Sequence, residues 1–184
     1  MHPLSRALRR DLASLTGIAA NDLSILWRQF DTAEDARDGL MEALPRLVAL
    51  YGAAAATLAS DYFDSMREDS GVRGRFEAIT AEPELGGLAV LARWAVGPLF
   101  QADPDPDAAL SLAGGGMQKA IADAARLTVV QSSIQDRASA GWVRVGDGGC
   151  DWCAKFLDGE VHYSPGYDFA AHNNCGCTAE PDYQ

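Results

Sequence analysis

Apolar positions in the first 140 residues recur in steps of three and four, the spacing that places one stripe along the side of a helix. The longest stripe predicts a helix that begins after a cap at Asp31 or Thr32 and ends near Ser70-Gly71. Pro45 lies inside this segment, where we expect it to bend or briefly break the helix. The stripe consists of Leu40, Leu44, Leu47, Tyr51, Ala54, Leu58 and Tyr62. A stripe of this length predicts the core of a helical bundle.

Shorter segments with the same spacing predict further helices around the long one. These helices are expected over residues 3–15, 21–30, 83–100 and 110–138. We expect the first to stop at Thr16-Gly17 and the second to start at Asn21, a good capping residue. Alternating prolines over residues 103–107 predict a stiff connector, because the residue before a proline avoids the helical region. The Gly114-Gly115-Gly116 run predicts a weak point in the last helix.

The pattern changes at Ala140-Gly141, after which glycine, aspartate and asparagine become frequent. Residues 142–145 alternate like a short strand. The Asp158-Gly159 dipeptide follows Phe156-Leu157 and precedes another short apolar run, at residues 161–163. This arrangement predicts a β-hairpin with its turn at Asp158-Gly159.

The formal net charge of −11 excludes some partners. Nucleic-acid binders gain affinity by neutralising phosphates with Lys and Arg, so we expect no direct nucleic-acid binding, sequence-specific recognition included. The uncharged run over residues 47–60 is too short for a membrane span of about 20 residues. Arg9 and Arg10 interrupt the segment where a signal peptide would have its apolar core. We therefore expect synthesis in the cytosol, reduced thiols and no membrane partner.

All four cysteines lie in the last 35 residues, which in a cytosolic protein favours a metal over disulfides. Cys150 and Cys153 are separated by two residues, and His172, Cys175 and Cys177 follow after 18 more. Structural zinc is tetrahedral and takes four thiolates, or three thiolates and one imidazole. Two clusters with these spacings therefore predict a zinc site.

Five candidate ligands compete for four positions, and the residues leave the choice open. One set uses Cys150, Cys153, His172 and Cys175, and another uses all four cysteines with His172 as a hydrogen-bond donor beside them. We favour three thiolates and His172, with Cys175 or Cys177 as the fourth ligand. A site with four protein ligands has no open position, so its expected role is structural.

The small size of the C-terminal segment supports the metal. Residues 141–184 hold few large apolar side chains, and a segment of this size rarely folds without disulfides, a bound metal or a similar cross-link. Zinc bound by thiolates supplies roughly 10 kcal/mol or more of apparent folding energy. The expected fold class is α+β: a mainly helical body over residues 1–140 and a small zinc-stapled β-hairpin module over residues 141–184.

Enzymatic motifs are missing from the sequence, and we expect no catalytic residues. A zinc deaminase needs His-x-Glu and Pro-Cys-x-x-Cys, and many zinc proteases use His-Glu-x-x-His; the chain has none of these. The Gly114-Gly115-Gly116 run lacks the Lys-Ser/Thr ending of a phosphate-binding loop. His162 lies on the predicted hairpin, where we interpret it as an exposed strand residue.

With these residues identified, the chain resembles the MuF-like minor head proteins of tailed bacteriophages, named for the F protein of phage Mu. The resemblance rests on a specific order of motifs over about 60 residues. These are residues 126–131 of the last helix, 141–144, Cys150-x-x-Cys153, 157–159 and His172-x-x-Cys175-x-Cys177 before Pro181. The commoner second cluster has Pro after its His and Arg between its cysteines, where this chain has Asn173 and Gly176.

The resemblance implies a structural protein of the virion that contacts the phage portal or the major capsid protein. It would be assembled in the host cytoplasm, lie in the head interior or at the portal vertex, and be homo-oligomeric or present in several copies. The protease and toxin domains that some relatives carry have no counterpart in this chain. Two alternatives are a host zinc-ribbon-like adaptor or regulator, and a small zinc-dependent nuclease or toxin.

Overall fold

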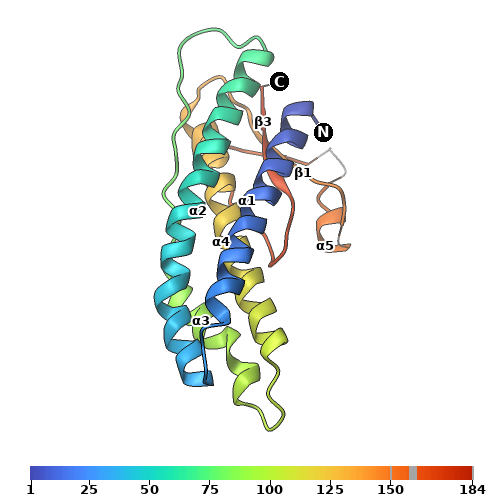
Figure 1. The fold of residues 1–184 in the computed structure, drawn as a ribbon. Coiled ribbons are helices and arrows are strands. Elements are labelled where there is room, and N and C mark those ends of the chain that lie inside the picture. Colours follow the sequence, from blue (N-terminus) through green and yellow to red (C-terminus); the bar gives the residue numbers. More distant parts are fainter. Residues whose placement is uncertain (150, 158–160, 184) are drawn as a thin grey trace.

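The computed structural model describes residues 1–149, 151–157 and 161–183. Three long helices lie side by side along the molecule: α1 (Pro3–Trp27), α2 (Ala33–Asp69) and α4 (Pro106–Gln135) (Figure 1). A short helix α3 (Leu88–Ala95) and a 3-10 turn η1 (Gly97–Phe100) join α2 to α4 at the end of the bundle away from the sheet. The remaining elements are β1 (Gly141–Val145), α5 (Asp151–Ala154), β2 (His162–Tyr163) and β3 (Thr178–Asp182). The chain is mainly helical with a small C-terminal sheet, which confirms that part of the predicted fold class.

The ends of α2 agree with the sequence prediction. The Thr32 side chain caps the helix by accepting a hydrogen bond from the Asp35 amide at 3.1 Å, and Ser70 follows the last turn. The chain stays helical through Pro45, so the predicted break is absent. The predicted apolar stripe is correct only in part. Leu40, Leu44 and Tyr62 are buried, whereas the other four members, Leu47, Tyr51, Ala54 and Leu58, are half-buried. Val48, which the stripe did not include, is fully covered.

Helix α1 is continuous where the sequence predicted two helices. Thr16 donates from its Oγ1 to the Leu12 carbonyl at 2.9 Å, a bond within the helix, and the chain does not turn at Gly17. A glycine inside a helix costs about 1 kcal/mol relative to alanine. Burial of Leu12, Ala19 and Leu23 along one face of α1 outweighs that cost.

Gly116, the last glycine of the run in α4, packs against α3. The helix passes through the run without interruption, so the predicted weak point does not break the helix. A Cβ atom on Gly116 would lie 2.4 Å from Leu91 of α3, so the helices approach this closely only because the side chain is missing. The helix predicted over residues 83–100 is shorter than expected, since Gly87 takes a left-handed conformation (φ 83°) directly before α3.

Helix α2 is also long and apolar enough to cross a membrane by length and composition. It packs against α1, α3 and α4, and its buried residues belong to the same core as those helices. We therefore describe α2 as the central core helix of the bundle.

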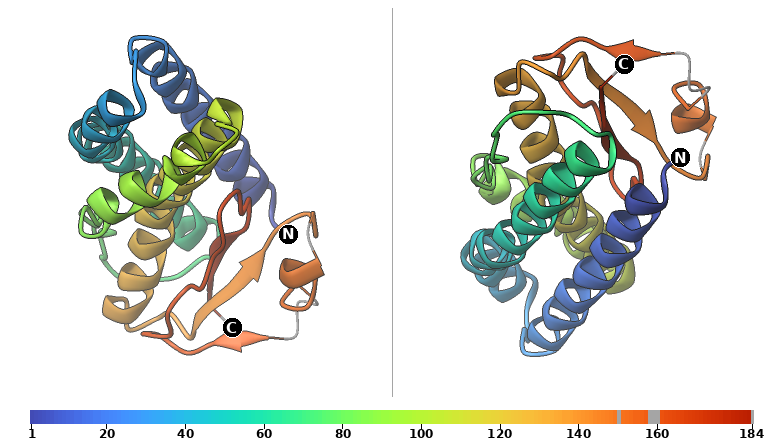
Figure 2. Two further views of the ribbon diagram at one scale, coloured as in Figure 1. Left: turned by 90° about the horizontal axis from the view of Figure 1, so that it is seen from below. Right: turned by 90° about the horizontal axis from the view of Figure 1, so that it is seen from above.

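The sheet has the order β2-β1-β3, with both pairs antiparallel (Figure 2). Strand β1 confirms the strand predicted over residues 142–145, and β3, which pairs with it along its whole length, was not predicted. The predicted hairpin is wrong in its pairing, because β2 pairs with β1 and Phe156-Leu157 form a turn after α5. The predicted turn at Asp158-Gly159 lies outside the described residues.

The sheet packs directly on the helices. Trp142 is fully buried in the same core cluster as Phe63 and Met117, and its ring stacks on Tyr163 with centroids 4.2 Å apart. Polar contacts join the first and last elements, since the Ser5 hydroxyl donates to a Glu180 carboxylate oxygen at 2.5 Å. The C-terminal segment is therefore held by both apolar packing and hydrogen bonds to the bundle.

Candidate metal centre

A tight turn brings together two donors of the second cluster. The Cys175 amide donates to the His172 carbonyl at 3.2 Å, and Asn174 between them adopts a left-handed conformation with φ 59°. Asparagine is one of the few residues other than glycine that enters this region readily. The turn places the side chains of His172 and Cys175 on the same side of the segment, facing α5.

The third donor comes from α5. Cys153 is buried in this helix, and its Sγ lies 3.3 Å from His172 Nε2 and 3.5 Å from Cys175 Sγ. All three ligand atoms lie within 4.8 Å of one another. In tetrahedral zinc sites the bond lengths imply S···N and S···S separations of about 3.5 and 3.8 Å. The group has the donor types and the spacing to hold a metal ion.

The imidazole of His172 is oriented for metal binding. Its Nδ1 lies 2.6 Å from the Asn173 carbonyl oxygen, a contact in which the nitrogen carries the proton and donates. This leaves the lone pair on Nε2, the atom that faces Cys153. Histidines that bind metals usually donate their other ring N–H to a carbonyl or carboxylate in this way.

The other two predicted ligands are Cys150 and Cys177. Cys150 lies outside the described residues. Cys177 is buried next to the group, and its thiol donates a hydrogen bond to Cys175. That hydrogen bond, more than the positive charge of Arg126, lowers the pKa of Cys175, and the same bond together with burial raises the pKa of Cys177. A thiolate at Cys175 is the form that binds metal.

Two arginines of the helical bundle hold the backbone of the second cluster. Arg126 of α4, 2% exposed, donates from Nη2 to the Cys175 carbonyl at 2.6 Å and from Nε to the Cys177 carbonyl at 3.0 Å. Arg9 of α1 donates from Nε to the Gly176 carbonyl at 2.8 Å. Three consecutive carbonyls therefore accept hydrogen bonds from two different helices.

Sequence reasoning did not assign a role to either arginine. The acceptors are backbone carbonyls, which carry no residue-type signal, and Arg126 entered the sequence analysis only as the first residue of the motif over residues 126–131. A further buried arginine, Arg144 of β1, lies over the Phe169 ring at 3.9 Å and donates to the Ala170 carbonyl. Of these arginines, Arg126 acts on the thiols: after the hydrogen bond from Cys177, its positive charge also lowers the pKa of Cys175 and so favours the thiolate.

His162 is an exposed residue of β2, as expected from the sequence. Its Nδ1 contacts an Asp182 carboxylate oxygen at 2.7 Å across the sheet. This pair lies apart from the candidate metal-binding group, and it was not predicted because Asp182 belongs to the unpredicted strand β3.

Taken together, fold and site define a helical-bundle protein whose C-terminal sheet carries a candidate Cys/His metal centre. Residues 4–184 match the VG15 protein family, so the chain belongs to this family and is a bacteriophage protein. No curated protein and no solved structure matches the chain.

Proposed function

We propose that this phage protein is a minor structural protein of the head, placed beside the portal or the inner capsid surface, with a structural zinc ion in its Cys/His centre. We further propose that it is present in several copies per virion and has no catalytic activity.

The convergence of Cys153, His172 and Cys175 is the observation that carries the zinc proposal. Two thiols and an imidazole are donors that zinc prefers, and Cys150 or Cys177 is available as the fourth ligand. Four protein ligands leave no position for a substrate or an activated water. The ion would supply folding energy by joining α5 to the turn at residues 172–175.

The head assignment rests on the VG15 family together with the order of motifs shared with MuF-like proteins. The site geometry fits a passive role. Arg9 and Arg126 fix the ligand backbone to the bundle, which gives a rigid surface suited to contact with another protein. The net charge of −11 favours protein partners over the packaged DNA.

Quantitative mass spectrometry of purified virions tests the head assignment. We expect the chain in intact particles, at a constant ratio to the portal protein and retained after nuclease treatment. Abundance in infected cells together with absence from particles would contradict the proposal and favour a regulatory role in the host. Metal analysis of the reductively purified protein tests the zinc separately.

A further inference from the structure

A groove with an apolar floor runs along the outer face of α4. It encloses a cavity of about 240 Å³ whose floor is formed by α4 and by Phe169 of the C-terminal segment. Its apolar lining consists of Ala124, Leu127, Val130 and Phe169. Glu84, from the segment before α3, and Asp168 line the same cavity from opposite parts of the chain.

The floor continues into exposed apolar side chains. Leu127 is 37% exposed, and Ile134, two turns further along the same stripe of α4, is 51% exposed. Ile134 lies against Gly166, and Tyr167, the residue that follows Gly166, is 62% exposed. Leu85, which follows Glu84 directly, is 43% exposed. Exposed apolar residues that cluster around one groove, with charged residues at its edge, are typical of a protein interaction site.

The edge of the groove carries negative charge that the chain does not neutralise. Glu84 and Asp168 are exposed and form no ion pair with any residue that the structure describes. Asp123 and the buried Arg126 also line the cavity, where Asp123 is paired with Lys119 and Arg126. A partner for this surface should therefore carry a basic group beside two apolar side chains.

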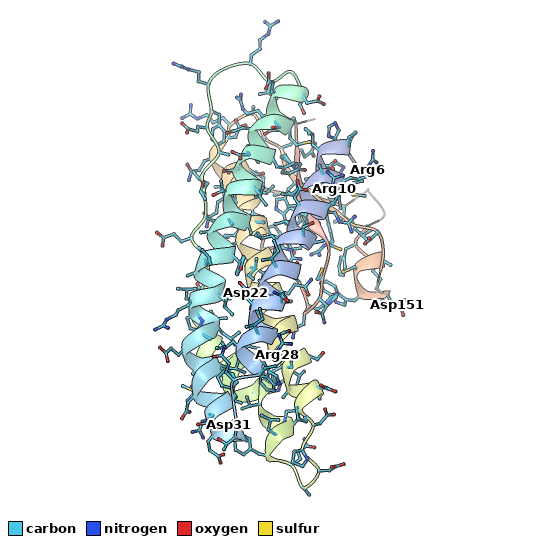
Figure 3. The ribbon with its side chains drawn as sticks, in the orientation of Figure 1. Arg6, Arg10, Asp22, Arg28, Asp31 and Asp151 are labelled. Carbon is cyan, nitrogen blue, oxygen red and sulfur yellow. The ribbon has the colours of Figure 1, made fainter. Side chains whose placement is uncertain are left out.

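The outer face of α1 carries both two exposed apolar side chains and a basic group. Ile18 and Ile25 are 54% and 45% exposed, and like Leu127 and Ile134 they are seven residues apart, which is about 10.5 Å along a helix. Arg28 follows one turn after Ile25, is exposed, and has no carboxylate partner among the described residues. Figure 3 shows Arg28 at one end of α1 and Arg6 and Arg10 near the other.

We infer that a second copy of this chain docks the outer face of its α1 onto the α4 groove. The helices are antiparallel, so that Ile25 lies beside Leu127, Ile18 beside Ile134, and Arg28 reaches Glu84. The two surfaces are different, so each copy offers one donor face and one acceptor groove, and the contact extends into a ring or a chain of copies. The inference rests on the multi-copy part of the proposed function and names its contact surfaces.

Sedimentation velocity with three single variants tests the contact. Ile25→Asp removes the donor face, Leu127→Asp removes the groove, and Leu50→Asp changes a residue of α2 that is 64% exposed and lies in neither surface. We expect the unmodified chain and Leu50→Asp to associate as concentration rises, and the other two variants to stay monomeric. Circular dichroism checks that all variants are folded.

Mixing the two monomeric variants gives the decisive result. The Ile25→Asp chain keeps an intact groove and the Leu127→Asp chain an intact α1 face, so the mixture should form a 1:1 dimer and nothing larger. A charge exchange tests the register, because Arg28→Glu should weaken association and Glu84→Arg in the same chain should restore it.

Several outcomes would overturn the inference. These are an unmodified chain that stays monomeric up to about 1 mM, association that persists in both single variants, or a mixture that forms no dimer. Detection of the chain in virions does not depend on these measurements, so the head assignment can survive the failure of this contact.

Discussion

Arg126 Nη2 lies 2.6 Å from the carbonyl oxygen of Cys175, so a buried side chain of the central bundle holds the backbone of a candidate metal ligand. The same guanidinium also donates from Nη1 to an Asp123 carboxylate oxygen at 2.6 Å and lies over the Phe169 ring. The metal centre and the bundle are thus coupled through one residue, which leads to the first prediction.

Arg126→Met should destabilise the protein by about 2–4 kcal/mol, because two buried carbonyls lose charge-assisted hydrogen bonds. Urea unfolding followed by circular dichroism measures this loss. Arg9→Met is the matched comparison, because Arg9 pairs with the largely exposed Asp147. This substitution should lower the free energy of unfolding by about 1 kcal/mol or less. Equal effects of the two substitutions would contradict the structural distinction between them.

Zinc should bind at about one ion per chain and should be lost when Cys153 is changed to serine. The Cys153 sulfur belongs to the three-donor group, and serine is a poor zinc ligand. Elemental analysis after dialysis measures the stoichiometry, and the helical circular dichroism signal should persist. Cys177→Ser separates the ligand sets: retained zinc favours the set with His172 and Cys175, whereas lost zinc assigns Cys177 as a ligand.

Gly116→Ala should lower stability by about 1–3 kcal/mol, because the new Cβ would lie 2.4 Å from Leu91 and force α3 away. Gly17→Ala is the control in the exposed part of α1, where no atom lies within 4 Å of the added Cβ. That substitution should instead stabilise the protein by about 0.5–1 kcal/mol. Thermal unfolding of both variants measures the contrast, and a stabilising Gly116→Ala would show that α3 does not pack this closely.

Tyr62 should make the protein less stable at alkaline pH. Burial raises the pKa of Tyr62 above its ordinary value of 10.0, so above pH 10 the folded state keeps a proton that the unfolded state has lost. Its contribution to stability is complete below pH 10 and decreases as the pH rises further, by about 1.4 kcal/mol per pH unit. Tyr62→Phe should therefore flatten the fall in unfolding free energy between pH 10 and 11.5.

The sequence was sufficient for those features that depend on local periodicity or on residue type. The bounds of α2 followed from one apolar stripe and a cap at Asp31 or Thr32, and the candidate metal-binding group of Cys153, His172 and Cys175 lies among the residues whose spacing predicted a zinc site. Strand β3 could not be predicted, because Pro181 argues against a strand and its pairing with β1 joins segments more than 30 residues apart. Proline is tolerated there because β3 lies at the edge of the sheet.

The continuity of α1 was not predicted because it also depends on contacts with distant segments of the chain. Thr16-Gly17 is a reasonable stop signal locally, and only packing of Leu12, Ala19 and Leu23 on the other helices overrides it. The proposed contact between copies could not be found from sequence either. Exposed residues at helical spacing have the same pattern as core residues, and only their exposure in the fold distinguishes Ile18 and Ile25 from Leu12 and Leu23.

The hydrogen bond from Arg9 to the Gly176 carbonyl spans 167 positions of the chain. On the ribosome, α1 emerges well before the segment that its arginine will hold, by about 10–30 s at ordinary rates of elongation. During that interval the arginine and the apolar face of α1 have no native partner at the C-terminal end. Nascent chains arrested before residue 176 should therefore bind chaperones through α1 and release them once translation proceeds.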